Sequence, residues 1–178
     1  PIRPIKFGAG VRALTTGGET VMFRHEKTFY NPTGLAALIP SDMDAAAIDK
    51  KLKEWNALQY ERVGLNLRPE LVAIKDVNGD QSAFSGVAEK VAKESEFNLI
   101  LMSENPDIIK AGVDAAGFKK PLLYAATKDN VDDMGNIAKE SNLPLAIKAD
   151  SIDELISLSD KLTGMGLKDL VLDSGSRE

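Results

Sequence analysis

Short apolar runs alternate with longer amphipathic runs from about residue 71 to the end of the chain. The apolar runs cover residues 71–75, 99–103, 121–127, 144–149 and 169–173. Each run is nearly all apolar, as expected for strands of a sheet that is covered on both faces. The later runs begin about every 23 to 25 residues, which is the length of one compact βα unit. The pattern therefore predicts parallel strands joined by crossover helices.

The segments between these runs have the spacing and the end signals of helices. Helical periodicity covers residues 82–95, 106–116, 131–141 and 152–163. Asn105 precedes Pro106, Asp129 or Asn130 precedes Val131, and Ser151 stands three residues before Glu154, which are helix-start signals. Helix ends are predicted at Gly117, Asn142, Gly164 and Gly166.

The first seventy residues are less regular. Residues 20–23 (TVMF) predict a strand, residues 44–57 predict a helix, and residues 62–67 fit a short strand or an extended connection. The whole chain then has six strong strands and about five helices, whereas a closed TIM barrel has roughly eight of each. We expect an α/β fold in which residues 1–178 form an incomplete TIM barrel of about six βα units. An open doubly wound sheet is the alternative, although no G-x-G-x-x-G follows a strand.

Composition indicates one globular domain, with 43% hydrophobic and 28% charged residues. The net charge of -5 gives no general attraction to nucleic acid or anionic lipid. The apolar runs are too short to span a bilayer, so we expect a soluble, cytoplasmic protein without nucleic-acid or membrane partners. Because the chain starts at Pro1 and ends soon after the run at 169–173, we also expect it to be part of a longer protein.

Few residues are suited to metal or redox chemistry. The chain contains no cysteine and one histidine, His25. Thiolate ligation of an iron–sulfur cluster and a histidine-rich zinc site are therefore excluded. We expect that the chain holds neither a cluster nor cobalamin through ligands of its own.

In a parallel barrel the working groups lie at the carboxyl ends of the strands. Six residues at such positions are candidates for a pocket: His25, Asp76, Thr127, Lys148, Asp150 and Asp173. A ring of carboxylates and lysines could move protons or bind a polar ligand if burial shifted the pKa values. Helix caps and surface ion pairs explain residues of this kind equally well. We therefore predict no catalytic residue.

Two of these candidates have a more specific alternative chemistry. His25 titrates near neutral pH and has Arg24 and Glu26 beside it, yet a single histidine is more often a hydrogen-bonded structural group. Lys148 lies within an apolar run, where a desolvated amine could form a Schiff base as in an aldolase. Its stem could equally pack along the barrel while the ammonium reaches the polar mouth. The glycine-rich segments 6–10 and 15–19 do not have phosphate-loop spacing and are explained as turns leading into the first strand.

Three longer stretches carry a family resemblance: residues 18–32 (GETVMFRHEKTFYNP), 60–69 (YERVGLNLRP) and 166–173 (GLKDLVLD). They resemble the barrel domain in the large (gamma) subunit of corrinoid iron–sulfur proteins, so the likeness extends over nearly the whole chain. The resemblance implies a methyl carrier of the acetyl-CoA pathway. Its cobalamin takes a methyl group from methyltetrahydrofolate through a methyltransferase and delivers it to acetyl-CoA synthase.

The resemblance also implies a parent chain of three parts, in which a cysteine-rich domain with a 4Fe–4S cluster and a corrinoid domain flank the barrel. A small subunit forms a second barrel. This sequence lacks the cluster cysteines, so no cofactor ligand of the family can be placed on a residue here. The expected role is a non-catalytic scaffold that pairs with the small subunit. A stand-alone barrel enzyme, or a barrel that binds a pterin or another small ligand, is the alternative.

Overall fold

The computed structural model describes residues 3–18, 31 and 33–175. A six-stranded parallel sheet has the order β10-β9-β8-β7-β6-β3. Its strands are β3 (Ala36–Pro40), β6 (Leu71–Lys75), β7 (Asn98–Met102), β8 (Leu122–Ala126), β9 (Leu145–Lys148) and β10 (Leu170–Asp173). Five helices connect them: α1 (Ala45–Ala57), α2 (Gln81–Glu94), α3 (Pro106–Ala116), α4 (Val131–Ser141) and α5 (Ile152–Gly164).

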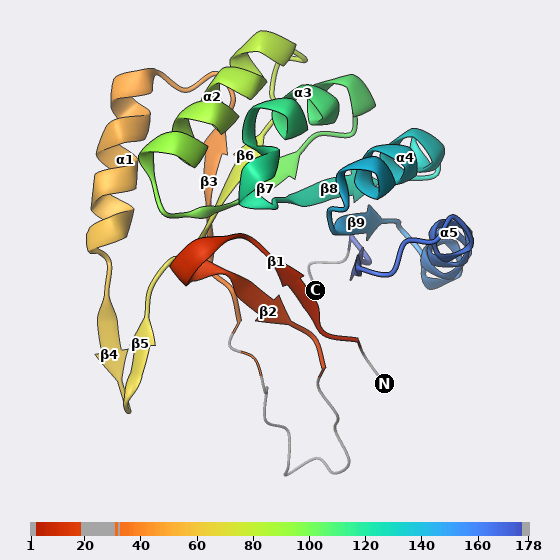
Figure 1. The fold of residues 1–178 in the computed structure, drawn as a ribbon, viewed down its shortest axis with the longest axis horizontal. Helices are drawn as coiled ribbons and strands as arrows, with labels where there is room; N and C mark the ends of the chain where they lie inside the picture. Colours follow the sequence, from red (N-terminus) through yellow and green to blue (C-terminus); the bar gives the residue numbers. More distant parts are fainter. Residues whose placement is uncertain (1–2, 19–30, 32, 176–178) are drawn as a thin grey trace.

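The strand order decides between the two expected architectures. The strands follow one another in sequence order without reversal, and the helices lie along one face of the sheet (Figure 1). A doubly wound sheet reverses its order and places helices on both faces, whereas a barrel is wound in one direction. The structure therefore confirms an α/β fold like an incomplete TIM barrel, and no closed barrel is found among the described residues.

Two apolar clusters cover the two faces of the sheet. On the helix side, Ile74, Leu101 and Leu145 pack against helix residues such as Phe84 and Met134. The opposite face, called here the inner face, is covered at its amino end by a short antiparallel ribbon. The ribbon consists of β1 (Ile5–Phe7) and β2 (Leu14–Thr16), joined through the 3-10 helix η1 (Gly10–Arg12). Its side chains Ile5, Phe7 and Leu14 pack with Leu71, Leu122 and Ala146.

Buried polar contacts fix this ribbon to the sheet. Asn98, the fully buried first residue of β7, accepts a hydrogen bond from Ala9 N and donates one to the carbonyl of Arg12. Gly8 has φ 84° and lies so close to the Asn98 amide that a side chain would collide with it. The glycines at 8 and 10 thus serve this close approach and turn. They do not lead directly into a strand of the main sheet.

The sequence predicts most of the elements but not all of them. Five predicted strands and all five predicted helices are confirmed, with shifts of at most one residue at most ends. Asn105 and Ser151 accept backbone hydrogen bonds as N-caps, as predicted. The sixth strand of the sheet is β3, which the apolar pattern does not predict, and the predicted strand at 20–23 lies outside the described residues.

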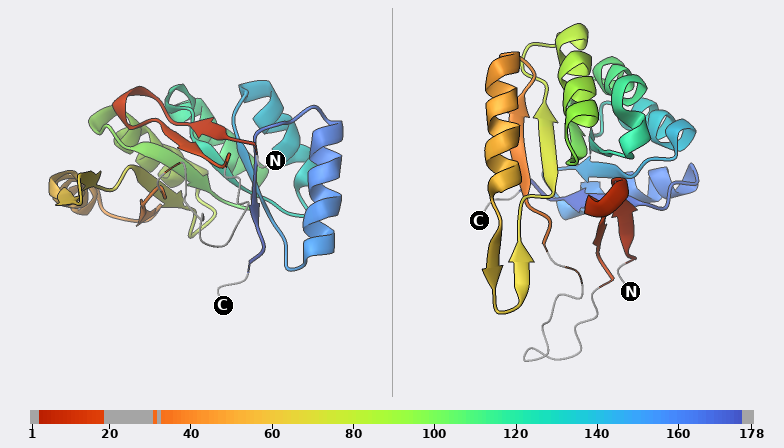
Figure 2. Two further views of the ribbon diagram at one scale, coloured as in Figure 1. Left: turned by 90° about the horizontal axis from the view of Figure 1, so that it is seen from below. Right: turned by 60° about the vertical axis from the view of Figure 1, so that its left-hand side comes forward.

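Residues 62–67 belong to neither a single strand nor a plain connection. They contribute to a second antiparallel ribbon of β4 (Tyr60–Arg62) and β5 (Leu65–Leu67), which turns at Val63 and Gly64. This ribbon follows α1 and projects away from the sheet and helices (Figures 1 and 2). A further 3-10 helix, η3 (Gly117–Lys119), leads into β8. No helix in the described ranges combines the length and apolar character needed to traverse a bilayer.

Candidate functional site at the strand carboxyl ends

The carboxyl ends of β7, β8, β9 and β10 bring together a cluster of polar side chains. Alternation along the strands places Tyr124, Lys148 and Asp173 on the inner face, and Lys148 pairs in register with Asp173. The Tyr124 hydroxyl donates a 2.7 Å hydrogen bond to Asp173 Oδ2, reaching across β9. Lys148 Nζ lies 2.8 Å from Glu104 Oε1 at the end of β7. The four strand ends are thus joined by charged and phenolic groups.

A small pocket of about 180 Å³ opens beside this cluster. Its lining includes three predicted residues, Thr127, Lys148 and Asp150, together with Glu104 and Glu154. Asn130 is buried and holds the pocket wall in place. Its amide donates to the carbonyls of Glu104 (2.7 Å) and Ala125 (3.2 Å), while its oxygen accepts from Thr127 N (2.7 Å). Asn130, which with Asp129 is one of the two predicted N-caps of α4, occupies that position, but its side chain is bonded to these loops and makes no cap hydrogen bond.

The remaining predicted residues lie elsewhere. Asp76 accepts hydrogen bonds from Ser103 Oγ and from Gly79 N, each at 2.9 Å, so it ties β6 to β7 and closes a turn. Asp173 belongs to the inner-face cluster but not to the lining of the small pocket. His25 lies outside the described residues. The structure therefore groups Thr127, Lys148 and Asp150, places Asp173 close to them through the register with Lys148, and separates Asp76.

The electrostatics of Lys148 favour an ion pair and not a nucleophile. The hydrogen bond to Glu104, followed by the charge of Glu104, raises the pKa of Lys148 above its usual value. A Schiff-base lysine must lose its proton before it attacks a carbonyl, which requires a lowered pKa. The ion pair with Glu104 and the raised pKa of Lys148 thus disfavour the aldolase-like alternative. Within the described part of the chain, no three His, Cys, Asp or Glu side chains are grouped so that they could hold a metal ion.

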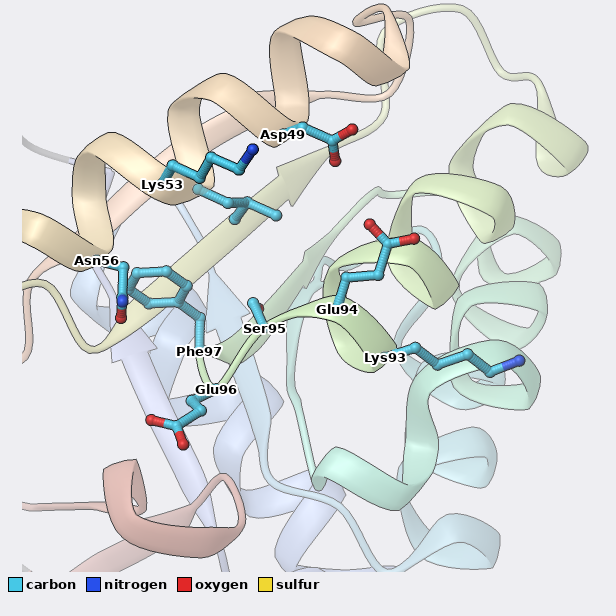
Figure 3. Close-up of a pocket in the computed structure, with 9 residues that line it drawn as sticks. Asp49, Lys53, Asn56, Lys93, Glu94, Ser95, Glu96 and Phe97 are labelled. Atoms are coloured by element: carbon cyan, nitrogen blue, oxygen red, sulfur yellow. The ribbon is translucent and has the colours of Figure 1, made fainter.

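A larger pocket of about 680 Å³ lies at the opposite end of the sheet, between α1 and the connection that leads into β7 (Figure 3). Asp49 and Lys53 extend from α1, and Ser95, Glu96 and Phe97 line the other side. This is the amino end of the strands, which in barrels serves stability more than chemistry.

Beside Asn56 and Phe97, which line this pocket, the buried Arg12 joins the first ribbon to α1. It donates to Pro69 O (2.9 Å) and Asn56 Oδ1 (2.5 Å), and its guanidinium lies 4.4 Å from the centre of the Phe97 ring. Burial lowers its pKa, the largest of several effects on that group. Arg12, Asn98 and Tyr124 are not predicted from the sequence. Only Tyr124 has a visible signal there, as a polar residue within an apolar strand.

Comparison with known proteins gives a family match over almost the whole chain. The family described as "CO dehydrogenase/acetyl-CoA synthase delta subunit" matches residues 4–178. The chain is 38% identical over 178 residues to the corrinoid/iron-sulfur protein large subunit of Moorella thermoacetica, covering 100% of this chain and 40% of that protein. It is 39% identical over 176 residues to the acetyl-CoA decarbonylase/synthase complex subunit gamma 2 of Methanosarcina mazei, covering 98% and 37%.

A relative of lower identity agrees with these two. The gamma subunit of the same complex from Methanothermobacter thermautotrophicus is 30% identical over 176 residues, which is 98% of this chain and 38% of that protein. The chain therefore spans about two fifths of the length of the curated relatives that it matches. The matched family has the name of a delta subunit, whereas these relatives are named as large or gamma subunits.

Proposed function

The chain belongs to the CO dehydrogenase/acetyl-CoA synthase delta subunit family, and we propose that it is the barrel scaffold of a corrinoid iron–sulfur protein large (gamma) subunit. The observation that carries this proposal is the likeness to large and gamma subunits over 98–100% of the chain. In this role the parent protein carries a methyl group from a methyltetrahydrofolate:corrinoid methyltransferase to acetyl-CoA synthase. The scaffold holds the parts that bind the cofactors and pairs with the small subunit in the cytoplasm.

Of the cofactors of such a parent, a 4Fe–4S cluster does not fit this sequence, and cobalamin does not fit the pocket at the strand ends of the described residues. Cluster ligation requires thiolates, and the sequence has no cysteine. Within the described residues, the strand-end pocket of about 180 Å³ is far smaller than a corrinoid needs. We therefore assign residues 1–178 to a partial barrel domain and place the cluster-binding and corrinoid-binding domains in other parts of the parent.

The pairing of the strand-end side chains with one another also agrees with a non-catalytic scaffold. Lys148 is paired with Glu104, and Tyr124 with Asp173, so the polar groups of the inner face satisfy one another. A pterin site at the strand ends would need a larger cavity than the pocket of about 180 Å³ there, since ligand pockets commonly measure roughly 300–1,000 Å³. The stand-alone enzyme or pterin-binding barrel is therefore the weaker candidate.

Binding to the companion small subunit tests the proposal directly. The 178-residue chain and a small subunit from the same source would be mixed at known concentrations and followed by analytical ultracentrifugation. We expect a one-to-one complex. Titration with methyltetrahydrofolate in a calorimeter should show no binding to the chain alone. Failure to bind the small subunit together with tight pterin binding would reverse the preference between the two candidates.

A further inference from the structure

The larger pocket, at the amino end of the strands and called here the amino-end pocket, has the size of a ligand site. Its volume of about 680 Å³ lies within the roughly 300–1,000 Å³ that small-molecule sites commonly occupy. One wall is a single face of α1, because its members recur at helical spacing: Asp49, Leu52, Lys53 and Asn56. The other wall is formed by residues 93–97, which lead from α2 into β7 (Figure 3). The amino-end pocket can therefore hold a small organic molecule.

Most charged side chains of this lining are already paired. Lys90 Nζ lies 2.8 Å from Asp49 Oδ1 and 2.6 Å from Glu94 Oε2, so it pairs with two lining carboxylates. Lys93 forms an ion pair with a glutamate one turn earlier on α2. Lys53 is exposed and extends from α1, and no described residue forms an ion pair with it. Lys53 therefore remains available to an anionic ligand.

The buried Arg12 at the edge of the amino-end pocket has a donor without an acceptor. Its two terminal nitrogens donate to Pro69 O and Asn56 Oδ1, whereas Nε makes no hydrogen bond with any described residue. Glu96 Oε2 lies 3.8 Å from Nε, beyond hydrogen-bond distance, and the Glu96 side chain is 71% exposed. A buried donor of this kind is uncommon and indicates an absent partner. Because Asn56 and Glu96 both line the pocket, an acceptor bound beside them would supply that partner.

Positive charge exceeds negative charge at this edge. Burial lowers the pKa of Arg12 and also that of Lys119, which donates a 2.9 Å hydrogen bond to a carbonyl of the pocket wall. The charge of Glu96 acts in the opposite direction on both pKa values, so one exposed carboxylate serves two partly desolvated cations. Arg68 lowers the pKa of Arg12 further, and Glu70 raises it. Three cations thus face two carboxylates, which favours a ligand with more than one negative charge.

We propose that the amino-end pocket binds the phosphate monoester of a small organic molecule. The phosphate accepts a hydrogen bond from Arg12 Nε and meets the ammonium of Lys53, while Glu96 turns toward solvent. Guanidinium groups match phosphate in geometry, and a phosphate monoester carries roughly 1.5 to 2 negative charges near neutral pH. The organic part packs against Leu52 and Phe97, the apolar residues of the lining. This site adds to the scaffold role proposed above and does not depend on it.

Four substitutions at exposed positions separate binding from folding. Lys53→Gln removes the available cation, and Lys50→Gln is the matched control on the same helix, outside the pocket lining. Glu96→Gln removes the carboxylate that competes with the ligand, and Glu140→Gln on α4 makes the same charge change away from the pocket. Each variant should keep a urea unfolding midpoint close to that of the unaltered chain, since exposed substitutions usually change stability little.

Phenyl phosphate, inorganic phosphate and benzoate are the probes, and the NMR signal of the Arg12 Nε–H reports the contact directly. We expect phenyl phosphate to shift this signal, to slow its exchange with water and to bind more tightly than the other two probes. Lys53→Gln should raise the dissociation constant of phenyl phosphate about two- to fivefold, the effect of one exposed charge pair. Glu96→Gln should lower the dissociation constant, and the two controls should leave it unchanged.

Three outcomes would overturn the phosphate site. Phenyl phosphate could leave the Arg12 signal unmoved, or Lys53→Gln and Lys50→Gln could weaken binding equally, which would show only a general attraction between charges. Benzoate that binds as tightly as phenyl phosphate would refute the choice of a phosphate ligand. None of these outcomes bears on the scaffold role, because that proposal is tested by binding to the small subunit.

Discussion

At the scale of single residues, buried polar side chains hold together the parts of the chain that have little apolar core. Arg12 is only 4% exposed, and it bridges the first ribbon, the carbonyl of Pro69 and the end of α1 at Asn56. Neither its burial nor its partners can be predicted from the sequence, because an arginine in a glycine-rich segment is usually exposed. The same holds for Asn98, whose burial depends on how closely Gly8 approaches.

Replacing Arg12 should therefore destabilise the fold far more than replacing an exposed arginine. Arg12→Met keeps the length of the stem but leaves the Pro69 carbonyl and the Asn56 amide oxygen without these donors. We expect the free energy of unfolding to fall by about 1–3 kcal/mol. Arg3, which forms an exposed ion pair with Asp169, is the matched control. Arg3→Met should change the free energy of unfolding by at most about 1 kcal/mol. Equal effects of both changes in urea unfolding would contradict the bridging role of Arg12.

The ion pair of Lys148 has a definite pH dependence. Because Glu104 raises the pKa of Lys148 in the folded state, the pair contributes stability below the unfolded pKa of lysine, and this contribution is lost as the pH rises through the folded pKa. Glu104→Gln should lower the pKa of Lys148 toward 10.5. Asp150→Asn should lower it less, because Asp150 is the weakest of the raising effects. Lysine side-chain NMR titration measures both, and a larger fall for Asp150→Asn would refute the assignment.

The candidate site shows what residue patterns can and cannot predict. Thr127, Lys148 and Asp150 follow or end neighbouring parallel strands, so their proximity follows from the fold. Which carboxylate pairs with Lys148 depends on side-chain directions, and Glu104 was a strand-end residue without a predicted partner. Asp76 is an equally plausible pocket residue from the sequence. In the structure it accepts hydrogen bonds from Ser103 after β7 and from Gly79 in a turn, and it does not line the pocket.

At the scale of elements, predictability follows burial. The strands β6 to β10 and the helices between them have strong periodicity. Apolar side chains on one face of the sheet pack against the helices, and those on the inner face form a second apolar cluster. β3 is an edge strand with an exposed Leu38, and its sequence AALIP ends in proline, so its pattern is weak. The described side chains of the β4–β5 ribbon are exposed and impose no pattern, and the turn at Val63 lacks the usual asparagine–glycine signal.

Two helical glycines give opposite predictions for the same substitution. A Cβ added at Gly86 in α2 would meet nothing within 4 Å, whereas one added at Gly112 in α3 would lie 2.6 Å from Phe84 Cε1. Gly86→Ala should stabilise the chain by about 0.5–1 kcal/mol through helix propensity alone. Gly112→Ala should destabilise it, because α2 and α3 must move apart. Urea unfolding of both variants checks this, and a destabilised Gly86→Ala would mean that something packs against α2 there.

At the scale of the whole molecule, the sheet is wound in one direction but remains open between β10 and β3 in the described chain. β10 is hydrogen-bonded to β9 on one side and has no strand on its other side among these residues. Large apolar side chains of the same unit are more than half exposed: Leu172 on β10, and Ile152 and Ile156 on successive turns of α5. An unpaired strand edge beside exposed apolar side chains favours association.

A longer chain that adds about two βα units after β10 should therefore be more stable and less prone to associate. The added units would pair with β10 and cover the exposed side chains, and each kcal/mol gained should raise the unfolding midpoint by roughly 2–4 °C. Ile156→Lys with Leu172→Lys in the 178-residue chain should reduce light scattering without the extension. Phe118 on η3 is similarly exposed and serves as the control, so Phe118→Lys should leave the light scattering unchanged. If the 178-residue chain is monomeric and unfolds as cooperatively and at the same temperature as the longer chain, its sheet needs no further strands and the incomplete-barrel interpretation is wrong.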